Sequence, residues 1–125
     1  MTYLDTHIAI WLRQGDSSGF SRRVEKVLEA EDDFLVSPMV VLEFQMLYEI
    51  GRIPSSAETI MADLGRSIGL RVCDYPFGLI IEQALEEKWT REPADRIITA
   101  HARVRNATLV THDARIRENY KLAVW

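Results

Sequence analysis

Short apolar runs alternate with longer amphipathic segments along the whole chain. The runs predict five strands, over Met1–Asp5, Asp33–Ser37, Leu70–Cys73, Ala107–Thr111 and Leu122–Val124. Between the runs, apolar residues recur at helical spacing. They predict helices over Thr6–Arg13, Ser21–Ala30, Pro38–Ile50, Ser55–Ile68, Phe77–Leu85, Ala94–Arg105 and Asp113–Tyr120.

This alternation predicts an α/β fold with a central parallel sheet of about five strands and helices on both faces. The chain has 125 residues, close to the common domain size of about 100 to 150 residues, so we expect one domain over residues 1–125. In such sheets a ligand site lies beyond the carboxyl ends of the strands.

Composition narrows the class of protein. Apolar residues make up 47% and charged residues 27% of the chain, which is ordinary for a folded domain. There is no apolar run of about 20 residues and no secretory pattern after Met1, so a cytoplasmic protein without a membrane segment is expected. One cysteine and three scattered histidines argue against a disulfide and against structural zinc.

The net charge of −4 is unevenly distributed. Residues 1–87 have a balance of −8, whereas residues 88–125 have a balance of +4. A local basic surplus can bind a polyanion such as RNA, although solvated helix faces explain it equally well. The candidate phosphate contacts are Arg91, Arg96, Arg103, Arg105, Arg115 and Arg117.

A glutamate interrupts an apolar row on the third predicted helix. Glu43 shares the i, i+4, i+7, i+8 row of Met39, Met46, Leu47 and Ile50, which predicts a buried face. A buried carboxylate needs a cation, an arginine or a bound proton. An ion pair with an arginine, or a tilt toward the rim of the protein, is the structural alternative.

Three aspartates lie at strand ends or helix starts. Asp5 and Asp113 follow predicted strands, and Asp95 opens a helix whose row continues through Ile98 and Ala102. Each alone could be a helix cap or could favour a helix dipole. Together with Glu43 they would repel one another unless a cation binds, and carboxylates without paired histidines select Mg²⁺ or Mn²⁺. A water activated by such an ion suits phosphodiester hydrolysis.

Four segments resemble the acidic motifs of PIN-domain ribonucleases, most closely the VapC-type toxins of bacterial toxin–antitoxin pairs. They are Thr2–His7, Ser37–Glu43, Pro93–Ala100 and Leu109–Asp113. The resemblance implies a PIN-like domain with a five-stranded parallel sheet, Mg²⁺- or Mn²⁺-dependent endoribonuclease activity, and inhibition by a cognate VapB-type antitoxin. One departure is Glu92, where many relatives have an aspartate before the proline of the third motif.

The resemblance also implies roles for single residues. Asp5, Glu43, Asp95 and Asp113 would be the metal-binding and catalytic acids. Thr111 would orient Asp113 or a water on the metal, and Thr6 would cap the backbone or support an acid from behind.

The expected reaction is in-line attack of water on an RNA phosphodiester, leaving a 5′-phosphate and a 3′-hydroxyl. His7 and His112 flank motif acids and could act as bases, but a bystander role is expected because a metal can generate the nucleophile. Trp11, Trp89 and Trp125 are expected in the core or at an interface rather than stacked on bases.

Two other function classes stay open. A catalytically silent module of the same fold could bind only RNA or protein, although all four acids are present. Phosphoryl transfer on an aspartate would need paired acids after the first strand and a late lysine, or a second aspartate where His7 stands, and the chain lacks these patterns.

A toxin would also need a partner. The resemblance implies that an antitoxin tail, with a short helix and an arginine reaching the acids, covers the site. Apolar residues around Met46, Tyr48 and Ile50, beside the helix from Ser55, are the expected antitoxin groove or the face of a homodimer.

Overall fold

The computed structural model describes residues 1–125 and contains five strands and seven helices. The strands are β1 (Thr2–Leu4), β2 (Phe34–Val36), β3 (Arg71–Val72), β4 (Thr108–Val110) and β5 (Ala123–Val124). The helices are α1 (Thr6–Arg13), α2 (Arg22–Ala30), α3 (Pro38–Glu49), α4 (Ala57–Ile68), α5 (Phe77–Glu86), α6 (Pro93–Val104) and α7 (Ala114–Asn119). Every predicted element is present, and the strands are shorter than the apolar runs that predict them.

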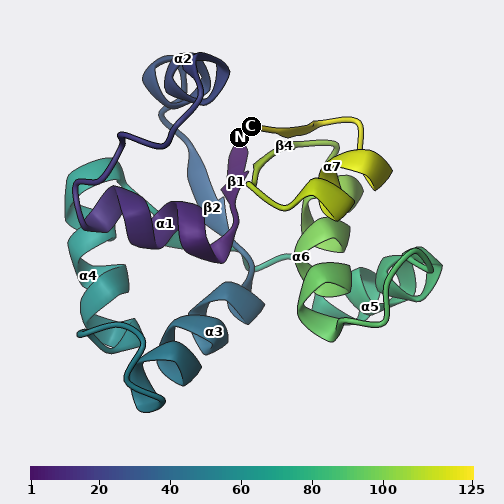
Figure 1. Cartoon of the computed structure of the whole chain (residues 1–125). Helices are drawn as coiled ribbons and strands as arrows, with labels where there is room; N and C mark the ends of the chain where they lie inside the picture. Colours follow the sequence, from purple (N-terminus) through teal and green to yellow (C-terminus); the bar gives the residue numbers. More distant parts are fainter.

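The strands form one parallel sheet in the order β3-β2-β1-β4-β5. Figure 1 shows α1 and α4 on one side of the strands, α5, α6 and α7 on the other, and α3 below them. The predicted α/β fold, with a parallel sheet between helices, is therefore confirmed. None of the helices combines the length and apolarity that crossing a bilayer requires.

Strand register decides which residues meet beyond the sheet. Leu4 on β1 pairs with Val110 on β4, and Val110 pairs in turn with Val124 on β5. The residues that follow these positions therefore emerge side by side at the carboxyl edge. The central position of β1 places the end of this strand between two neighbours.

Several helices begin at a serine or aspartate whose side chain caps the first turn. The side chains of Asp5, Ser21, Ser37, Ser56 and Asp113 each accept a backbone N–H in the first turn of a helix. Gly69 closes α4 with a φ of +70°, a left-handed conformation that glycine adopts without a Cβ penalty. Local chemistry thus fixes where these helices begin and end.

The predicted buried face of α3 is wrong in part, because Met39 and Leu47 pack partly buried against the main core but the rest of the row does not. Met46 and Ile50 are 52% and 67% exposed, and the helix instead buries Val40 and Phe44 against the main core. Apolar residues surround this helix on nearly every side, so their spacing does not single out one face. Glu43 therefore faces an open cleft and is only partly buried.

Candidate functional site

A cleft of about 380 Å³ opens at the carboxyl edge of the sheet. It is lined by all four predicted acids, together with Thr6, His7, Ile8, Trp11 and His112. The acids come from the β1–α1 junction, α3, α6 and the β4–α7 junction. Around the lower end of the strands in Figure 1, the helices α1, α3 and α6 frame this region. The fold thus gathers residues that are far apart in the sequence.

Asp5 is the most firmly fixed of the four acids. Its Oδ1 accepts the Thr6 N–H at 2.8 Å, and its Oδ2 accepts the Thr111 hydroxyl at 2.6 Å. Its own N–H donates to the Val110 carbonyl at 3.0 Å. The contact with Thr111 follows from register, because Leu4 pairs with Val110 and the next residues lie side by side.

Glu43 reaches the cleft from the second turn of α3. Its Oε1 accepts the hydroxyl of Thr6 at 2.5 Å, and Thr6 is only 3% exposed. The pKa of Glu43 lies above its ordinary value, mainly because burial disfavours the charged form. The Thr6 hydroxyl opposes this shift, and the Asp5 carboxylate adds to it. Thr6 is thus a positioning residue for an acid, and the backbone cap is Asp5.

One carboxylate oxygen of Asp113 caps a helix, and the other accepts no hydrogen bond from the protein. Its Oδ1 caps α7 by accepting the Ile116 N–H at 3.0 Å, and its own N–H donates to the Thr111 hydroxyl oxygen at 3.0 Å. Thr111 therefore contacts both Asp5 and the backbone of Asp113. The threonine joins the two strand ends that carry these acids.

Asp95 lies in the first turn of α6, and neither of its carboxylate oxygens accepts a hydrogen bond within the protein. Burial, the largest cause, together with the carboxylates of Asp113, Asp5 and Glu43, in that order of importance, raises its pKa from 3.8 to about 6. The row behind it is buried as predicted, with Ile98 at 2% and Ala102 at 0% exposure. Among the four acids, Asp95 therefore has the most carboxylate oxygens without a hydrogen-bond donor from the protein.

No lysine or arginine lines the cleft. Burial also raises the pKa of Asp5, against the opposing hydrogen bonds from Thr111 and Thr6. Several oxygens remain available, and a set of hard carboxylate donors without a lysine or arginine beside them fits Mg²⁺ or Mn²⁺. In the conformation described, no three acidic, histidine or cysteine side chains are arranged to hold one ion together.

The six predicted RNA-contact arginines have different environments. Arg103 forms an ion pair with Glu87, and its guanidinium lies 4.9 Å from the centre of the Tyr120 ring. Arg96 donates to the Thr90 carbonyl at 2.8 Å. These contacts link α6 to the segment between α5 and α6 and to the residue that follows α7.

The remaining arginines are less engaged. Arg91, Arg115 and Arg117 are exposed, and the first two donate to backbone carbonyls. Arg105 is partly buried, with its guanidinium 5.2 Å from the centre of the Tyr75 ring. None of the six lines the acidic cleft.

Glu87 was not singled out by the sequence pattern, yet it is the most buried carboxylate in the chain, at 2% exposure. The Arg103 Nε donates to its Oε1 at 2.5 Å, and the Trp89 indole N–H donates to its Oε2 at 2.7 Å. It lies among exposed charged residues in the sequence, at the end of an amphipathic helix, and carries no signal of burial.

Comparisons with known proteins agree with the fold. A family model described as PIN domain matches residues 2–122. A toxin–antitoxin complex from Klebsiella pneumoniae is similar with a TM-score of 0.67 and 21% identity, covering 100% of this chain and 97% of that one. VapBC2 from Rickettsia felis, bound to a DNA fragment from its promoter, has a TM-score of 0.66 and 21% identity, covering 100% and 98%.

A third solved structure is FitAcB from Neisseria gonorrhoeae, with a TM-score of 0.58 and 22% identity, covering 100% of this chain and 96% of that one. No curated protein matches the chain. At these identities the likeness to the solved structures concerns the fold.

Proposed function

The chain belongs to the PIN domain family, and on this premise we propose that it is a metal-dependent endoribonuclease that acts as the toxin of a toxin–antitoxin pair. One observation carries the proposal. Four carboxylates line a single cleft at the carboxyl edge of the sheet, and no lysine or arginine lines it with them. A protein that used these acids only for packing would pair them with its own cations.

Asp5, Glu43 and Asp95 are the proposed ligands of Mg²⁺ or Mn²⁺, and Asp113 holds a second ion or orders the attacking water. When bound, the ion supplies a water of lowered pKa and neutralises charge on the phosphodiester. Thr111 and Thr6 keep the Asp5 and Glu43 carboxylates in place through their hydroxyls. The carboxylate oxygens without protein partners would be available to hold the cation and its waters.

RNA would approach the cleft along the basic final third of the chain. The exposed Arg91, Arg115 and Arg117 are the proposed phosphate contacts, and Arg96 and Arg105 contribute at longer reach. Arg103 is the weakest member of the set, because its guanidinium is bound to Glu87 and to the Asn119 carbonyl.

The cleavage test uses the full chain with and without metal. RNA incubated with the protein and Mg²⁺ or Mn²⁺ should be cut to products with 5′-phosphate and 3′-hydroxyl ends, and a chelator should stop the reaction. Sequencing of RNA ends after induction in cells should show new ends for the parent and none for Asp5→Asn. Binding of RNA without cutting would instead indicate the silent module of the same fold.

The antitoxin partner is proposed to cover an apolar groove that continues from the acidic cleft. This groove of about 190 Å³ is lined by His7, Glu43, Met46, Leu47 and Ile50. It shares His7 and Glu43 with the acidic cleft. An antitoxin helix with apolar residues could fill the groove while an arginine beside it pairs with the acids. The solved relatives from Klebsiella pneumoniae and Rickettsia felis are toxin–antitoxin complexes, which supports this partner.

A matched pair of variants tests the partner surface. Ile50→Asp should weaken inhibition by the product of the neighbouring gene, whereas Leu85→Asp, a similarly exposed position on α5, should not. Equal loss in both variants would remove the groove from the proposal. Measuring the mass of the purified protein in solution tests the expected homodimer.

A further inference from the structure

A second cavity lies directly beside the acidic cleft. It has a volume of about 250 Å³ and is lined by Trp11, Asp16, Ser18, Gly19, His112 and Trp125. Trp11 and His112 also line the acidic cleft, so the two cavities share a wall. A molecule that enters the second cavity therefore sits next to the acids proposed to cut RNA.

Aromatic rings form the walls of this second cavity. The register of β4 and β5 pairs Val110 with Val124, and the chain beyond each strand brings the rings of His112 and Trp125 to 4.5 Å between centroids. The Trp11 ring lies 6.0 Å from each of these two rings. Three segments distant in the sequence thus build one aromatic surface.

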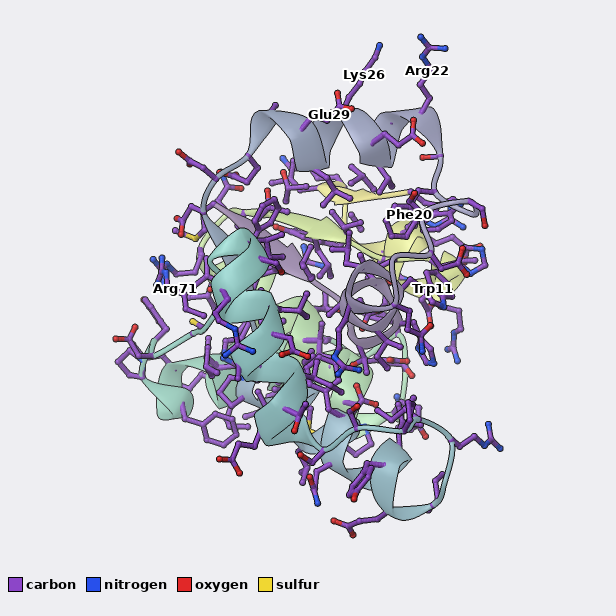
Figure 2. The ribbon with its side chains drawn as sticks, turned by 90° about the vertical axis from the view of Figure 1, so that its left-hand side faces the viewer. Trp11, Phe20, Arg22, Lys26, Glu29 and Arg71 are labelled. Atoms are coloured by element: carbon purple, nitrogen blue, oxygen red, sulfur yellow. The ribbon has the colours of Figure 1, made fainter.

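Phe20 fixes this surface from behind. It is buried and lies 6.3 Å from Trp11 and 6.0 Å from Trp125. In Figure 2, Trp11 and Phe20 lie on the same side of the molecule, beside α1 viewed end-on, and Arg71 lies on the opposite side. Trp11 and Trp125 are only partly buried, so parts of their ring surfaces remain open to a ligand.

The polar groups of the cavity exclude one kind of ligand and favour another. No lysine or arginine lines it, and the Asp16 carboxylate would repel a phosphate. Asp16 Oδ1 accepts the Ser18 hydroxyl at 2.7 Å, whereas no group of the protein donates to its Oδ2. Aromatic walls and a free carboxylate oxygen suit a neutral planar ring that carries N–H donors.

We propose that this cavity binds a nucleobase of the RNA next to the scissile phosphate, and that guanine fits it best. The inference rests on the proposed ribonuclease function. Stacking on the aromatic walls would hold any base, because every base has a flat π surface. Guanine alone offers two neighbouring donors, its N1–H and exocyclic amino group, to an acceptor such as Asp16. The volume is below the roughly 300–1,000 Å³ of pockets for drug-sized ligands, and it suits one base rather than a longer segment.

Ordinary packing is the alternative explanation for the aromatic cluster. Rings that serve only to join α1, the following loop and β5 would close upon one another and leave no room. Here a cavity remains open between them, and it continues into the acidic cleft. This assigns Trp11 and Trp125 a substrate role that their sequence positions do not predict.

Binding can be tested without any cleavage. The three indole N–H signals in an NMR spectrum report Trp11, Trp89 and Trp125, and Trp→Phe variants assign them. Trp89 provides an internal reference, because its indole donates to Glu87 away from the cavity. Guanosine 5′-monophosphate should shift the signals of Trp11 and Trp125 and leave that of Trp89 in place.

Ribose 5-phosphate is the matched probe without a base, and it should shift none of the three signals. Signals that stay unchanged with the guanine nucleotide, or that move equally with ribose 5-phosphate, would overturn the proposal. Adenosine, cytidine and uridine monophosphates should bind more weakly than guanosine monophosphate. Asp16→Asn should reduce this preference, and an unchanged preference would contradict the role of the carboxylate.

Cleavage provides the second measurement. The parent should cut an RNA with an abasic site beside the mapped cleavage position about tenfold less efficiently than the intact RNA, because stacking of one base is lost. Trp125→Ala should no longer distinguish the two RNAs. If it distinguishes them as well as the parent does, the subsite is wrong while the ribonuclease function stands. If the parent cuts no RNA, the NMR result alone decides whether a base binds here.

Discussion

Two regions of this protein bury carboxylates in opposite ways. Glu87 is almost fully buried, and both of its carboxylate oxygens accept hydrogen bonds. The Arg103 guanidinium donates to both oxygens, and the Trp89 indole N–H also donates to Oε2. The four acids of the cleft receive only hydroxyl and backbone donors, and Asp95 receives none. The difference separates an acid whose cation belongs to the chain from acids that, in the proposed function, would take their cation from outside.

The largest contrast should appear when one acid from each region is neutralised. Asp5→Asn should lower RNA cleavage about 100-fold or more, because residues that merely support a metal ligand already contribute about 10- to 100-fold. The thermal unfolding temperature of this variant should be equal to or higher than that of the parent. Cleavage rates and calorimetry on the same samples measure both effects.

Glu87→Gln should show the reverse pattern. The change leaves the Arg103 guanidinium opposite a neutral amide, and we expect the free energy of unfolding to fall by about 2 kcal/mol. This is below the full value for a buried pair, because the Arg103 side chain is 33% exposed and partly screened by solvent. Urea unfolding measures the loss. RNA cleavage that fell as far as in Asp5→Asn would erase the distinction between the two regions.

A smaller effect on RNA cleavage is expected when a hydroxyl that donates to one of the cleft acids is removed. Thr6→Val keeps the shape of the side chain and removes the donor to Glu43, so cleavage should fall about tenfold. Stability should change little, because the Glu43 carboxylate can still reach water in the cleft. Thr59→Val, an exposed hydroxyl on α4, is the matched control and should cleave like the parent.

The smallest effect concerns pH. Burial and the neighbouring acids raise the pKa of Asp95 from 3.8 to about 6, so the folded protein binds this proton more tightly than the unfolded chain does. Without metal, the ionised carboxylate should therefore reduce stability progressively as the pH rises from about 4 through about 6. At neutral pH Asp95→Asn should raise the free energy of unfolding by about 1 kcal/mol after allowance for solvent screening.

Urea unfolding of the metal-free proteins across this pH range tests the prediction. The difference between Asp95→Asn and the parent should be largest near pH 7 and should shrink as the pH falls toward 4. A variant less stable than the parent at pH 7 would show that Asp95 is neutralised within the protein, as Glu87 is.

Much of the fold could be predicted because its signals are local. Ser37 followed by Pro38, and aspartates after β1 and β4, mark helix starts that the structure contains. The alternation of apolar runs and helical segments predicts the parallel sheet that the structure contains. The face of α3 could not be predicted, because this helix is apolar on almost every side and only tertiary packing selects Val40 and Phe44.

The membership of the acidic cleft could also be predicted, but its internal contacts could not. Thr111 and Asp5 are 106 positions apart, and Thr6 and Glu43 are 37 apart. Such hydrogen bonds depend on strand register and helix placement, which leave no periodic trace in the sequence. The same holds for the ion pair between Glu87 and Arg103 and for the aromatic surface of Trp11 and Trp125.

The central place of β1 makes the walls of the cleft unequal. β1 has a hydrogen-bonded strand on either side, and Asp5 follows it directly. Amide protons of such a strand exchange with solvent only when the sheet itself opens, whereas Glu43 and Asp95 lie on helices near the protein surface. Asp5 is therefore the most firmly held acid of the cleft, and any adjustment to the ion of the proposed function would fall mainly to Glu43 and Asp95 on α3 and α6.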